Sequence, residues 1–285
     1  MRIGFLGYGE AGRAFHEGLT RPDLSVLAYD HALRGQANGD MRAAMTERGA
    51  AVVETAGELA TADWIFSAVT ADQSLAAVAD LASHLRRGHL LIDINSVSPE
   101  RKRATASLVA RSGADYLDMA VMAPVHPRRH ATPVLIAGPL AEPLLPKLTA
   151  LGFCAEIAGP TIGAATAIKM VRSLFVKGLE ALTVETLLSA QASGCYDYVL
   201  ASLSSSYPGL NWPDFAAYQF ERTLRHGERR AAEMRESAET LAALGLQGTL
   251  ADEIADVQAA MGQCGLGAET DLHDVVKASL KKRMS

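Results

Sequence analysis

The sequence predicts an α/β protein in which an N-terminal domain, built on a doubly wound sheet, is followed by an all-helical C-terminal domain. Three observations carry this prediction. Short apolar runs alternate with amphipathic stretches over the first 160 residues, a glycine-rich turn follows the first run, and strand signals stop after Gly159-Pro160. We therefore expect domains at residues 1–160 and 161–285.

The N-terminal domain contains eight apolar runs with the length of buried strands. Strands covered on both faces read as continuous apolar runs, as these mostly do. The runs occupy residues 3–7, 24–30, 50–54, 64–69, 89–94, 116–121, 133–138 and 153–158. Helices are expected between them at residues 10–21, 72–84, 98–112 and 141–151. The third begins with Ser98 as N-cap and Pro99 at the first helical position.

The C-terminal domain reads as helices separated by turns that contain glycine or proline. The turns lie at residues 194–196, 207–213, 245–248 and 262–267. The first helix, residues 161 to 193, is long and apolar nearly all round, which is typical of a helix buried between domains or subunits. Its apolar surface exceeds what the N-terminal domain can cover, so we expect a homodimer or larger oligomer.

Composition excludes several classes of protein. With 49% hydrophobic and 21% charged residues the chain is globular, and a net charge of −5 offers no basic excess for nucleic acid. Apolar stretches stay below the ~18 residues of a membrane helix, so we expect a cytoplasmic protein that binds no membrane.

Cys154, Cys195 and Cys264 form no CxxC pair and are interpreted as reduced core thiols. Residues 126–130 place two histidines around arginines, which predicts an exposed loop and no metal site.

A GxGxxG motif at residues 7–12 lies between the first strand and the first helix. There the glycines permit a tight turn, close approach to a pyrophosphate and helix–strand packing, while the helix N-terminus attracts the anion. Asp30 ends the second strand, where a carboxylate accepts hydrogen bonds from an adenosine ribose; the alternative is a solvated turn residue. NAD is predicted and NADP is less favoured, because Asp30 repels a 2'-phosphate, an effect that Arg34 would soften. The expected cofactor contacts are Gly7, Tyr8, Gly9, Glu10, Ala11, Gly12, Asp30, Val69 and Thr70.

Polar residues with chemical potential occur at two further places. Asn95 and Ser96 follow a strand at the edge where open α/β sheets bind ligands, and suit a substrate carboxylate or hydroxyl; helix capping is the alternative. Lys169 sits within the most apolar helix, where it either reaches water or has its pKa lowered by desolvation, as acid–base chemistry near neutral pH requires. Arg172 shares its helix face, would lower the pKa of Lys169 further, and can bind a carboxylate through two hydrogen bonds.

In their order along the chain, these motifs resemble the β-hydroxyacid dehydrogenases, the family of 3-hydroxyisobutyrate dehydrogenase, which is related to 6-phosphogluconate dehydrogenase. The resemblance rests on the glycine loop, Asp30, D-x-N-S-x-S-P at 93–99, D-M-A-V-M-A-P at 118–124 and G-x-x-x-x-x-K at 163–169, and it spans most of the chain. It is strongest to a poorly characterised branch with a C-terminal domain of unknown function. The resemblance implies a Rossmann-type domain that binds NAD(P), and hydride transfer to or from a small 3-hydroxy acid or its semialdehyde.

The resemblance also implies roles for single residues, with Lys169 as the acid/base. Two departures from the family pattern imply a different mode of substrate recognition. Arg172 stands where the family has asparagine, and Met122-Ala123-Pro124 stands where it has Ser-Gly-Gly, so that a backbone donor and a hydroxyl are lost and Arg172 is expected to compensate. The predicted catalytic residues are Lys169, Arg172 and Ser96. The predicted substrate contacts are Asn95, Ser96, Met122, Ala123, Pro124, Arg172 and His226.

Two other functions stay open at this point. Imine reductases share the architecture, although they generally lack a lysine at this position. A cofactor-binding regulatory protein without catalysis is compatible with the altered 122–124 segment.

The charged run at residues 225–230 is a solvated face or a place where His226 and Arg229 meet a substrate anion. The dehydrogenase scheme requires no metal.

Overall fold

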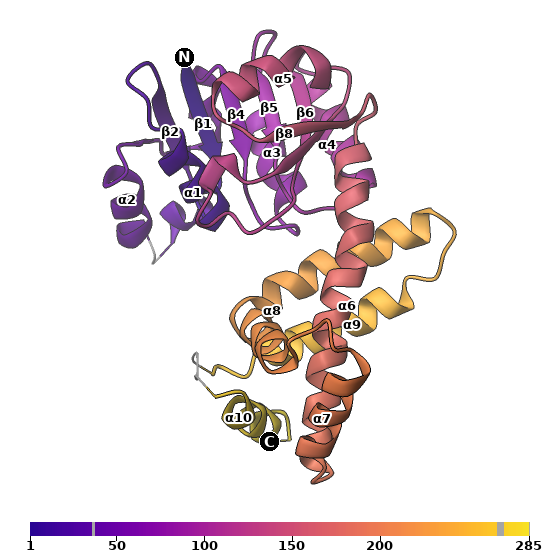
Figure 1. Cartoon of the computed structure of the whole chain (residues 1–285). Helices are drawn as coiled ribbons and strands as arrows, with labels where there is room; N and C mark the ends of the chain where they lie inside the picture. The colour runs from indigo at the N-terminus through magenta and orange to yellow at the C-terminus, as the bar shows by residue number, and fades with distance from the viewer. Residues whose placement is uncertain (36–37, 267–270, 285) are drawn as a thin grey trace. The chain divides into compact units, whose positions relative to one another are not determined.

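The computed structural model describes residues 1–35, 38–266 and 271–284 of the chain (Figure 1). The described chain divides into two compact units, Met1–Lys169 and Met170–Ser285. The division falls inside helix α6 (Ala164–Ala192), which begins shortly after the boundary expected between residues 160 and 161. The first residues of α6, including Lys169, therefore belong to the N-terminal unit.

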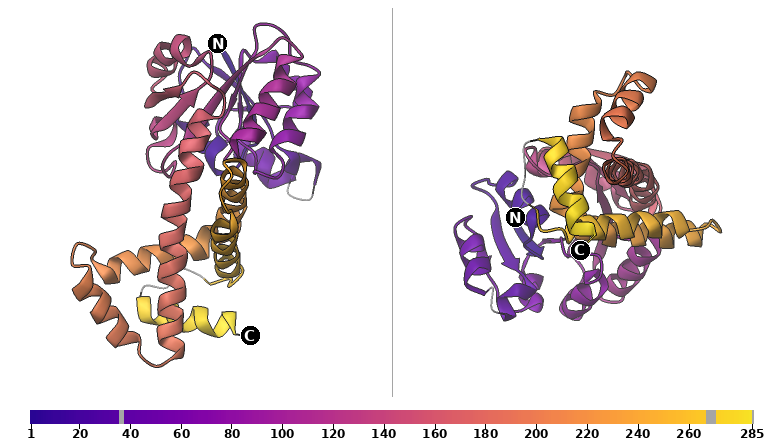
Figure 2. Two further views of the ribbon diagram at one scale, coloured as in Figure 1. Left: turned by 90° about the vertical axis from the view of Figure 1, so that its right-hand side faces the viewer. Right: turned by 90° about the horizontal axis from the view of Figure 1, so that it is seen from below.

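The N-terminal unit is built on an eight-stranded sheet in the order β3-β2-β1-β4-β5-β6-β7-β8. Crossovers lead away from β1 in both directions and helices lie on both faces of the sheet, so the doubly wound α/β prediction is confirmed (Figure 2). All neighbouring strands run parallel except β6 and β7, which are antiparallel. The strands are β1 (Arg2–Leu6), β2 (Ser25–Tyr29), β3 (Ala51–Val52), β4 (Trp64–Ser67), β5 (Leu90–Asp93), β6 (Asp115–Val121), β7 (Val134–Ala137) and β8 (Ala155–Gly159).

Four α-helices of this unit lie where their patterns predicted them, and α2 was not among the predicted helices. Ser98 takes the N-cap position with extended backbone and Pro99 starts the helix, as predicted. The α-helices are α1 (Glu10–Gly18), α2 (Asn38–Thr46), α3 (Ser74–Ala82), α4 (Pro99–Ala110) and α5 (Ala141–Ala150). Single 3₁₀ segments occur at η1 (His31–Arg34), η2 (Ala56–Thr61) and η3 (Arg129–Ala131).

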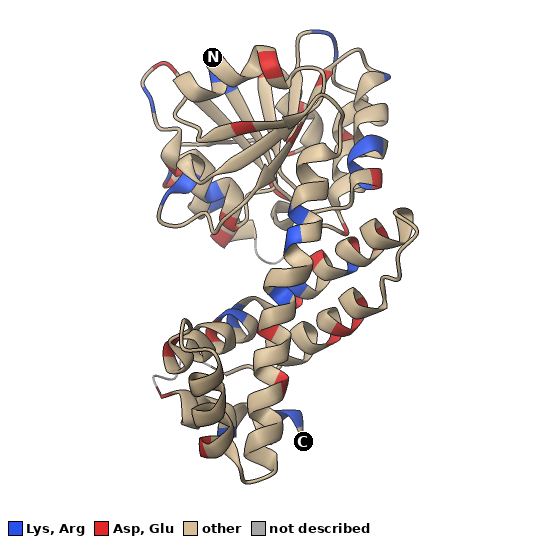
Figure 3. Ribbon diagram, turned by 45° about the vertical axis from the view of Figure 1, so that its right-hand side comes forward, with Lys and Arg blue, Asp and Glu red and all other residues tan. Residues whose placement is uncertain are grey.

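The core of the N-terminal unit lies between the sheet and its helices. Phe66 stacks with both Phe5 and Phe153, with ring centroids 5.5 and 5.8 Å apart, so β1, β4 and the segment before β8 are packed together. Charged residues lie mainly on helices and loops, and the strands carry few of them (Figure 3). Two of the charged residues within strands, Asp93 and Asp118, are fully buried, whereas Arg2, Asp115 and Glu156 are exposed.

Two expectations about this unit need correction. In the 126–130 segment the first four residues are exposed as predicted, but His130 is half-buried, packs edge-on against Phe153 and makes a 3.1 Å hydrogen bond with the carbonyl oxygen of Leu151. Cys154 is exposed rather than part of the core, and so is Cys195 in the second unit, because both lie in connecting segments at the surface.

The C-terminal unit is helical throughout the residues that the structure describes. After α6 come α7 (Tyr196–Ser206), α8 (Trp212–Ala243), α9 (Thr249–Gly262) and α10 (Leu272–Arg283), so the breaks fall at the expected turns, of which residue 267 lies outside the described part. Helices α8 and α9 approach very closely at Gly227 and Gly262. A Cβ atom on Gly227 would lie 2.2 Å from the carbonyl oxygen of Gln258 and 2.6 Å from the nitrogen of Gly262.

Helix α6 contributes buried polar residues to the C-terminal unit, although its sequence is mostly apolar. Glu180 is buried and pairs with Arg230 of α8, and Gln258 of α9 donates to the same carboxylate at 2.8 Å. The solvent-facing side of α6 is instead apolar, with Phe175 and Leu182 exposed to 70% and 66%. Among the described residues, no helix is long and apolar enough to cross a membrane.

Candidate functional site

The glycine loop joins β1 to α1 at the point where the strand order reverses. Gly7 has a φ of +88°, and a Cβ there would lie 2.6 Å from the carbonyl oxygen of Ala68, so no other residue fits the turn. A Cβ on Gly12 would lie 2.7 Å from the carbonyl oxygen of Gly7, which keeps α1 tight against the turn. Gly9 has no atom within 4 Å of a Cβ position. This open space before the N-terminus of α1 fits a cofactor pyrophosphate, with Glu10 and Ala11 in the first helical turn.

Tyr8 contributes to this loop mainly through its backbone. Its side chain is fully buried and its hydroxyl lies 2.5 Å from Nδ1 of His16, so the ring points into the core and away from solvent. Burial raises the pKa of Tyr8 to about 12. The prediction of Tyr8 as a cofactor contact is therefore restricted to its main chain.

Asp30 both caps a turn and fastens the glycine loop. Its Oδ2 accepts from the backbone N–H of Tyr8 at 2.7 Å and its Oδ1 accepts from that of Ala32 at 2.9 Å. A carboxylate has about four acceptor positions, so two remain for ribose hydroxyls. The two interpretations of Asp30, ribose contact and turn residue, are thus compatible. Nearby, the Arg34 guanidinium lies 5.6 Å from the ring centroid of Tyr29.

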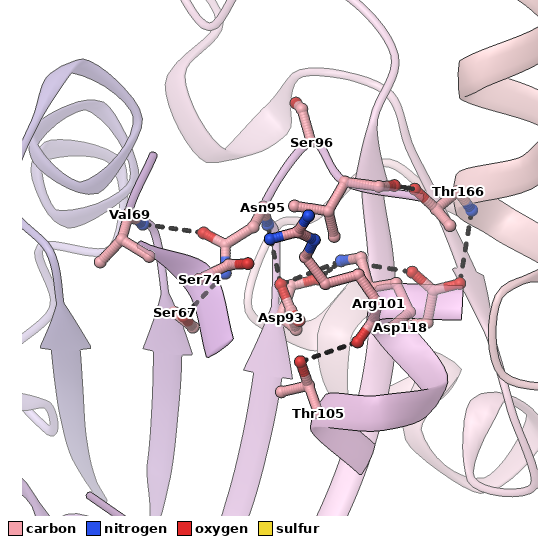
Figure 4. A network of polar contacts seen from close by, with 12 residues as sticks. Ser67, Val69, Ser74, Asp93, Asn95, Ser96, Arg101, Thr105, Asp118 and Thr166 are labelled. Carbon is pink, nitrogen blue, oxygen red and sulfur yellow. Dashed lines mark hydrogen bonds and ion pairs between the residues drawn. The ribbon is translucent and has the colours of Figure 1, made fainter. Parts of the chain in front are cut away.

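Asn95 joins the ends of two strands. Its Oδ1 accepts from the backbone N–H of Val69 at 2.8 Å, and its Nδ2 donates to Oγ of Ser67 at 2.9 Å (Figure 4). Only 3% of Asn95 is exposed, so we assign it to holding the ends of β4 and β5 together rather than to substrate. Val69 is half-buried, while the adjacent Thr70 is exposed.

Ser96 and Lys169 meet although 73 positions separate them in the sequence. Lys169 Nζ donates to Ser96 Oγ at 2.5 Å, and both side chains are partly exposed. Ser96 lies in the loop after β5, and Lys169 lies in the second turn of α6, so the pair sits beside the carboxyl end of the sheet where such folds bind ligands. A hydroxyl and an amine in this arrangement can hold the oxygen of an alcohol or carbonyl group and exchange a proton with it.

The remaining predicted substrate residues fall into two groups. Met122, Ala123 and Pro124 follow β6, with Met122 half-buried and the other two exposed. The backbone N–H of Met122 already donates to the carbonyl oxygen of Pro133, which leaves the segment poor in free donors. Arg172 and His226 belong to the C-terminal unit, where Arg172 is exposed and His226 is half-buried.

Lys102 is the residue at this site that sequence reasoning missed. It is fully buried, and its Nζ lies 3.0 Å from Oδ1 of Asp93 and 3.4 Å from Oδ1 of Asp118. A signal existed, because Lys102 shares the buried face of α4 with Ala106 and Val109. The neighbours Arg101 and Arg103 weaken that signal, because a run of basic residues is typical of a solvated helix face.

Comparisons with known proteins agree with this arrangement. Residues 2–155 match the NAD binding domain of 6-phosphogluconate dehydrogenase, and residues 190–261 match a domain of unknown function, DUF1932. A conserved hypothetical protein from Sinorhizobium meliloti 1021 is 35% identical, with a TM-score of 0.75 over 99% of this chain and 96% of that one.

Two named dehydrogenases are also similar. The 2-(hydroxymethyl)glutarate dehydrogenase of Eubacterium barkeri is 28% identical over 184 residues, which are 62% of this chain and 59% of that protein. The 3-hydroxyisobutyrate dehydrogenase of Mycobacterium tuberculosis, solved with L-serine, is 18% identical with a TM-score of 0.70 over 97% and 98% of the chains, a likeness of fold alone. The glycine loop, the sheet order and the two matched domains together show that this chain belongs to the β-hydroxyacid dehydrogenase-like family, with a C-terminal DUF1932 domain.

Proposed function

We propose that this protein is an NAD-dependent dehydrogenase of a small 3-hydroxy acid, or a reductase of the corresponding carbonyl compound, with Lys169 as acid/base. The family and its relatives indicate an NAD(P) oxidoreductase of the 3-hydroxyacid dehydrogenase type. The single observation that supports the finer proposal is the 2.5 Å hydrogen bond between Lys169 Nζ and Ser96 Oγ. It brings a proton-carrying amine and a hydroxyl together, and both side chains are partly exposed.

Nicotinamide, when bound along the Gly7–Gly12 loop, supplies the hydride acceptor or donor. In the oxidation, Lys169 as the neutral amine takes the hydroxyl proton while the C–H electron pair leaves as hydride, so a carbonyl forms and the ammonium is left. In the reduction the ammonium returns that proton. Ser96 orients the amine and offers its hydroxyl to the same substrate oxygen.

Arg172 is our candidate for the substrate carboxylate. The 122–124 segment offers few hydrogen-bond donors, because Pro124 has no backbone N–H and the N–H of Met122 already donates to Pro133. A guanidinium, in contrast, binds a carboxylate through two parallel hydrogen bonds. Asp30 would offer acceptor oxygens to an adenosine ribose and would repel a 2'-phosphate, so NAD is the proposed cofactor and NADP is less favoured.

The test is turnover of the wild-type protein and of Lys169→Met with NAD and a panel of 3-hydroxy acids that includes 2-(hydroxymethyl)glutarate. We expect turnover to fall roughly 10²–10⁴-fold in the variant, the usual range for loss of a general acid/base, while the Kd for NAD changes little. Lys147→Met, which removes an exposed lysine of α5, is the control and should have wild-type turnover.

Native turnover in Lys169→Met would place the chemistry elsewhere. Turnover of cyclic imines but of no hydroxy acid would favour the imine reductase alternative. Tight NAD binding without turnover of either class would favour a regulatory protein that uses the cofactor as a ligand.

A further inference from the structure

The proposed catalytic pair rests on a buried charged cluster, which we call the Lys102 cluster and which consists of Asp93, Lys102, Tyr116 and Asp118. Lys102 Nζ donates to the carbonyl oxygen of Asp93 at 2.6 Å and to its Oδ1 at 3.0 Å, and it lies 3.4 Å from Oδ1 of Asp118. The side chains of Lys102 and both aspartates have no exposed surface. Tyr116 donates its hydroxyl hydrogen to Oδ2 of Asp93 at 2.8 Å.

This cluster depends on its single cation. Burial raises the pKa of the Asp118 carboxyl, and burial together with the aspartates raises that of Tyr116, so negative charge is disfavoured here. Oδ1 of Asp118 has no hydrogen-bond donor within the described residues other than the ammonium of Lys102 facing it. Without Lys102, two carboxylates would remain buried side by side with no positive charge between them.

Each aspartate of the cluster in turn holds one segment of the candidate site. Oδ1 of Asp93 accepts from the backbone N–H of Asn95 at 2.9 Å, which fixes the loop that presents Ser96. Oδ2 of Asp118 accepts from the backbone N–H of Gly163, directly before α6, at 3.1 Å. It also accepts from the backbone N–H of Thr166, in the first turn of α6, at 3.3 Å (Figure 4).

The two segments are also joined directly. The hydroxyl of Thr166 donates to the carbonyl oxygen of Val97 at 2.8 Å, so the start of α6 lies against the loop after β5. Lys169 follows Thr166 by less than one helical turn, and Ser96 directly precedes Val97. Lys102 is therefore the shared anchor of the loop that carries Ser96 and of the helix start that carries Lys169.

We propose that Lys102 is a positioning residue that sets the distance between Lys169 Nζ and Ser96 Oγ, acting through Asp93 and Asp118 without touching substrate. This inference rests on the proposed function for its catalytic consequence. Its structural part, that one buried ammonium holds both segments in place, can be tested separately.

The experiment compares the full-length protein with Lys102→Met, a variant of similar length without the charge. Amide hydrogen exchange reports on the segments independently of activity. We expect the amides of Asn95, Gly163 and Thr166 to exchange at least tenfold faster, while that of Tyr8, bound by Asp30, keeps its rate. Arg111→Met, on the exposed end of the same helix, should change none of them.

The second readout is kinetic and is taken with the substrate that wild type turns over, per mole of bound NAD. We expect kcat to fall at least tenfold in Lys102→Met, with the Kd for NAD within threefold of wild type. Unchanged exchange at the three amides would overturn the inference, and so would faster exchange with a native kcat. If wild type turns over no substrate, the proposed function fails, and the exchange rates alone decide whether Lys102 anchors the two segments.

Tyr116→Phe covers the case in which Lys102→Met does not fold. This variant removes one hydrogen bond to Asp93 and leaves both ion pairs, so the fold is retained. We expect faster exchange at Asn95 and a several-fold lower kcat, with no change at Gly163 or Thr166. Native exchange at Asn95 together with a native kcat would contradict the positioning role.

Discussion

Asp30→Asn tests whether the carboxylate at the end of β2 selects the cofactor. The hydrogen bonds of Asp30 show which interactions the substitution removes. Asp30 accepts two backbone hydrogen bonds, at 2.7 Å from Tyr8 and 2.9 Å from Ala32, and an asparagine has one acceptor oxygen in place of two. One of the backbone bonds is lost, as is an acceptor for the ribose. At about 1.5–3 kcal/mol for a hydrogen bond to a charged group, each loss is measurable.

The two losses separate in the assay because only one of them depends on the ribose. Damage to the glycine loop weakens NAD and NADP alike, whereas loss of the ribose acceptor weakens NAD alone, and loss of the negative charge favours the 2'-phosphate of NADP. We expect the preference for NAD to narrow by about 1–3 kcal/mol, which is roughly 5- to 150-fold in the ratio of Kd values. Isothermal titration of each variant with both cofactors measures this ratio.

The matched control is Asp63→Asn. Asp63 is an exposed carboxylate that accepts from the backbone N–H of Arg2 at 2.8 Å, at the amino end of β1 and so opposite to the glycine loop. The Asp63→Asn substitution removes the same charge and should leave the ratio of the Kd values for NAD and NADP unchanged. A wild-type protein that prefers NADP tenfold or more would refute the reasoning, as would an Asp30→Asn variant with the wild-type ratio.

Four further outcomes are expected. Gly227→Ala should lower the free energy of unfolding by about 1–3 kcal/mol in urea melts, because backbone collisions at the α8–α9 crossing outweigh the better helix propensity of alanine, while Gly209→Ala, with open space around it, should be neutral. Burial, aided by the positive charge of Arg48, lowers the pKa of His16 in the folded protein, so the unfolded state binds the proton more readily. The free energy of unfolding should therefore fall as the pH drops below about 6.5, the usual pKa of histidine, and should fall less in His16→Gln. Arg172→Ala should raise KM for the acid more than it lowers kcat; the opposite split would exclude it as the carboxylate ligand. Phe175→Asp should convert a dimer to monomers in light scattering, and a wild-type protein that is already monomeric at micromolar concentration would contradict the predicted oligomer.

The sequence by itself determined the architecture of the chain and the place of its ligand edge. Buried parallel strands are apolar along their whole length, so each run in the N-terminal half marks a strand. Most gaps between runs are crossovers, and the exception is the connection between the antiparallel strands β6 and β7. The glycine loop was equally readable, because a left-handed turn at Gly7 and the close approach at Gly12 admit no side chain. Lys169 was noticeable as a lysine in a largely apolar helix, and Ser96 by its place after a strand.

Only the tertiary structure decided which polar residues are buried and hold the candidate site together. Asn95 is a residue type that can bind substrate, and in the structure it is buried and hydrogen-bonds to Ser67 and Val69 at the end of β4. Tyr8 turns its ring into the core. Lys102 resembles a surface lysine in its run of basic neighbours and is fully buried between two aspartates. The physical reason is range: periodicity reports on neighbours within one helix or strand, whereas the field and the solvent exposure of a side chain are set by groups from distant parts of the chain that meet only after the sheet has assembled.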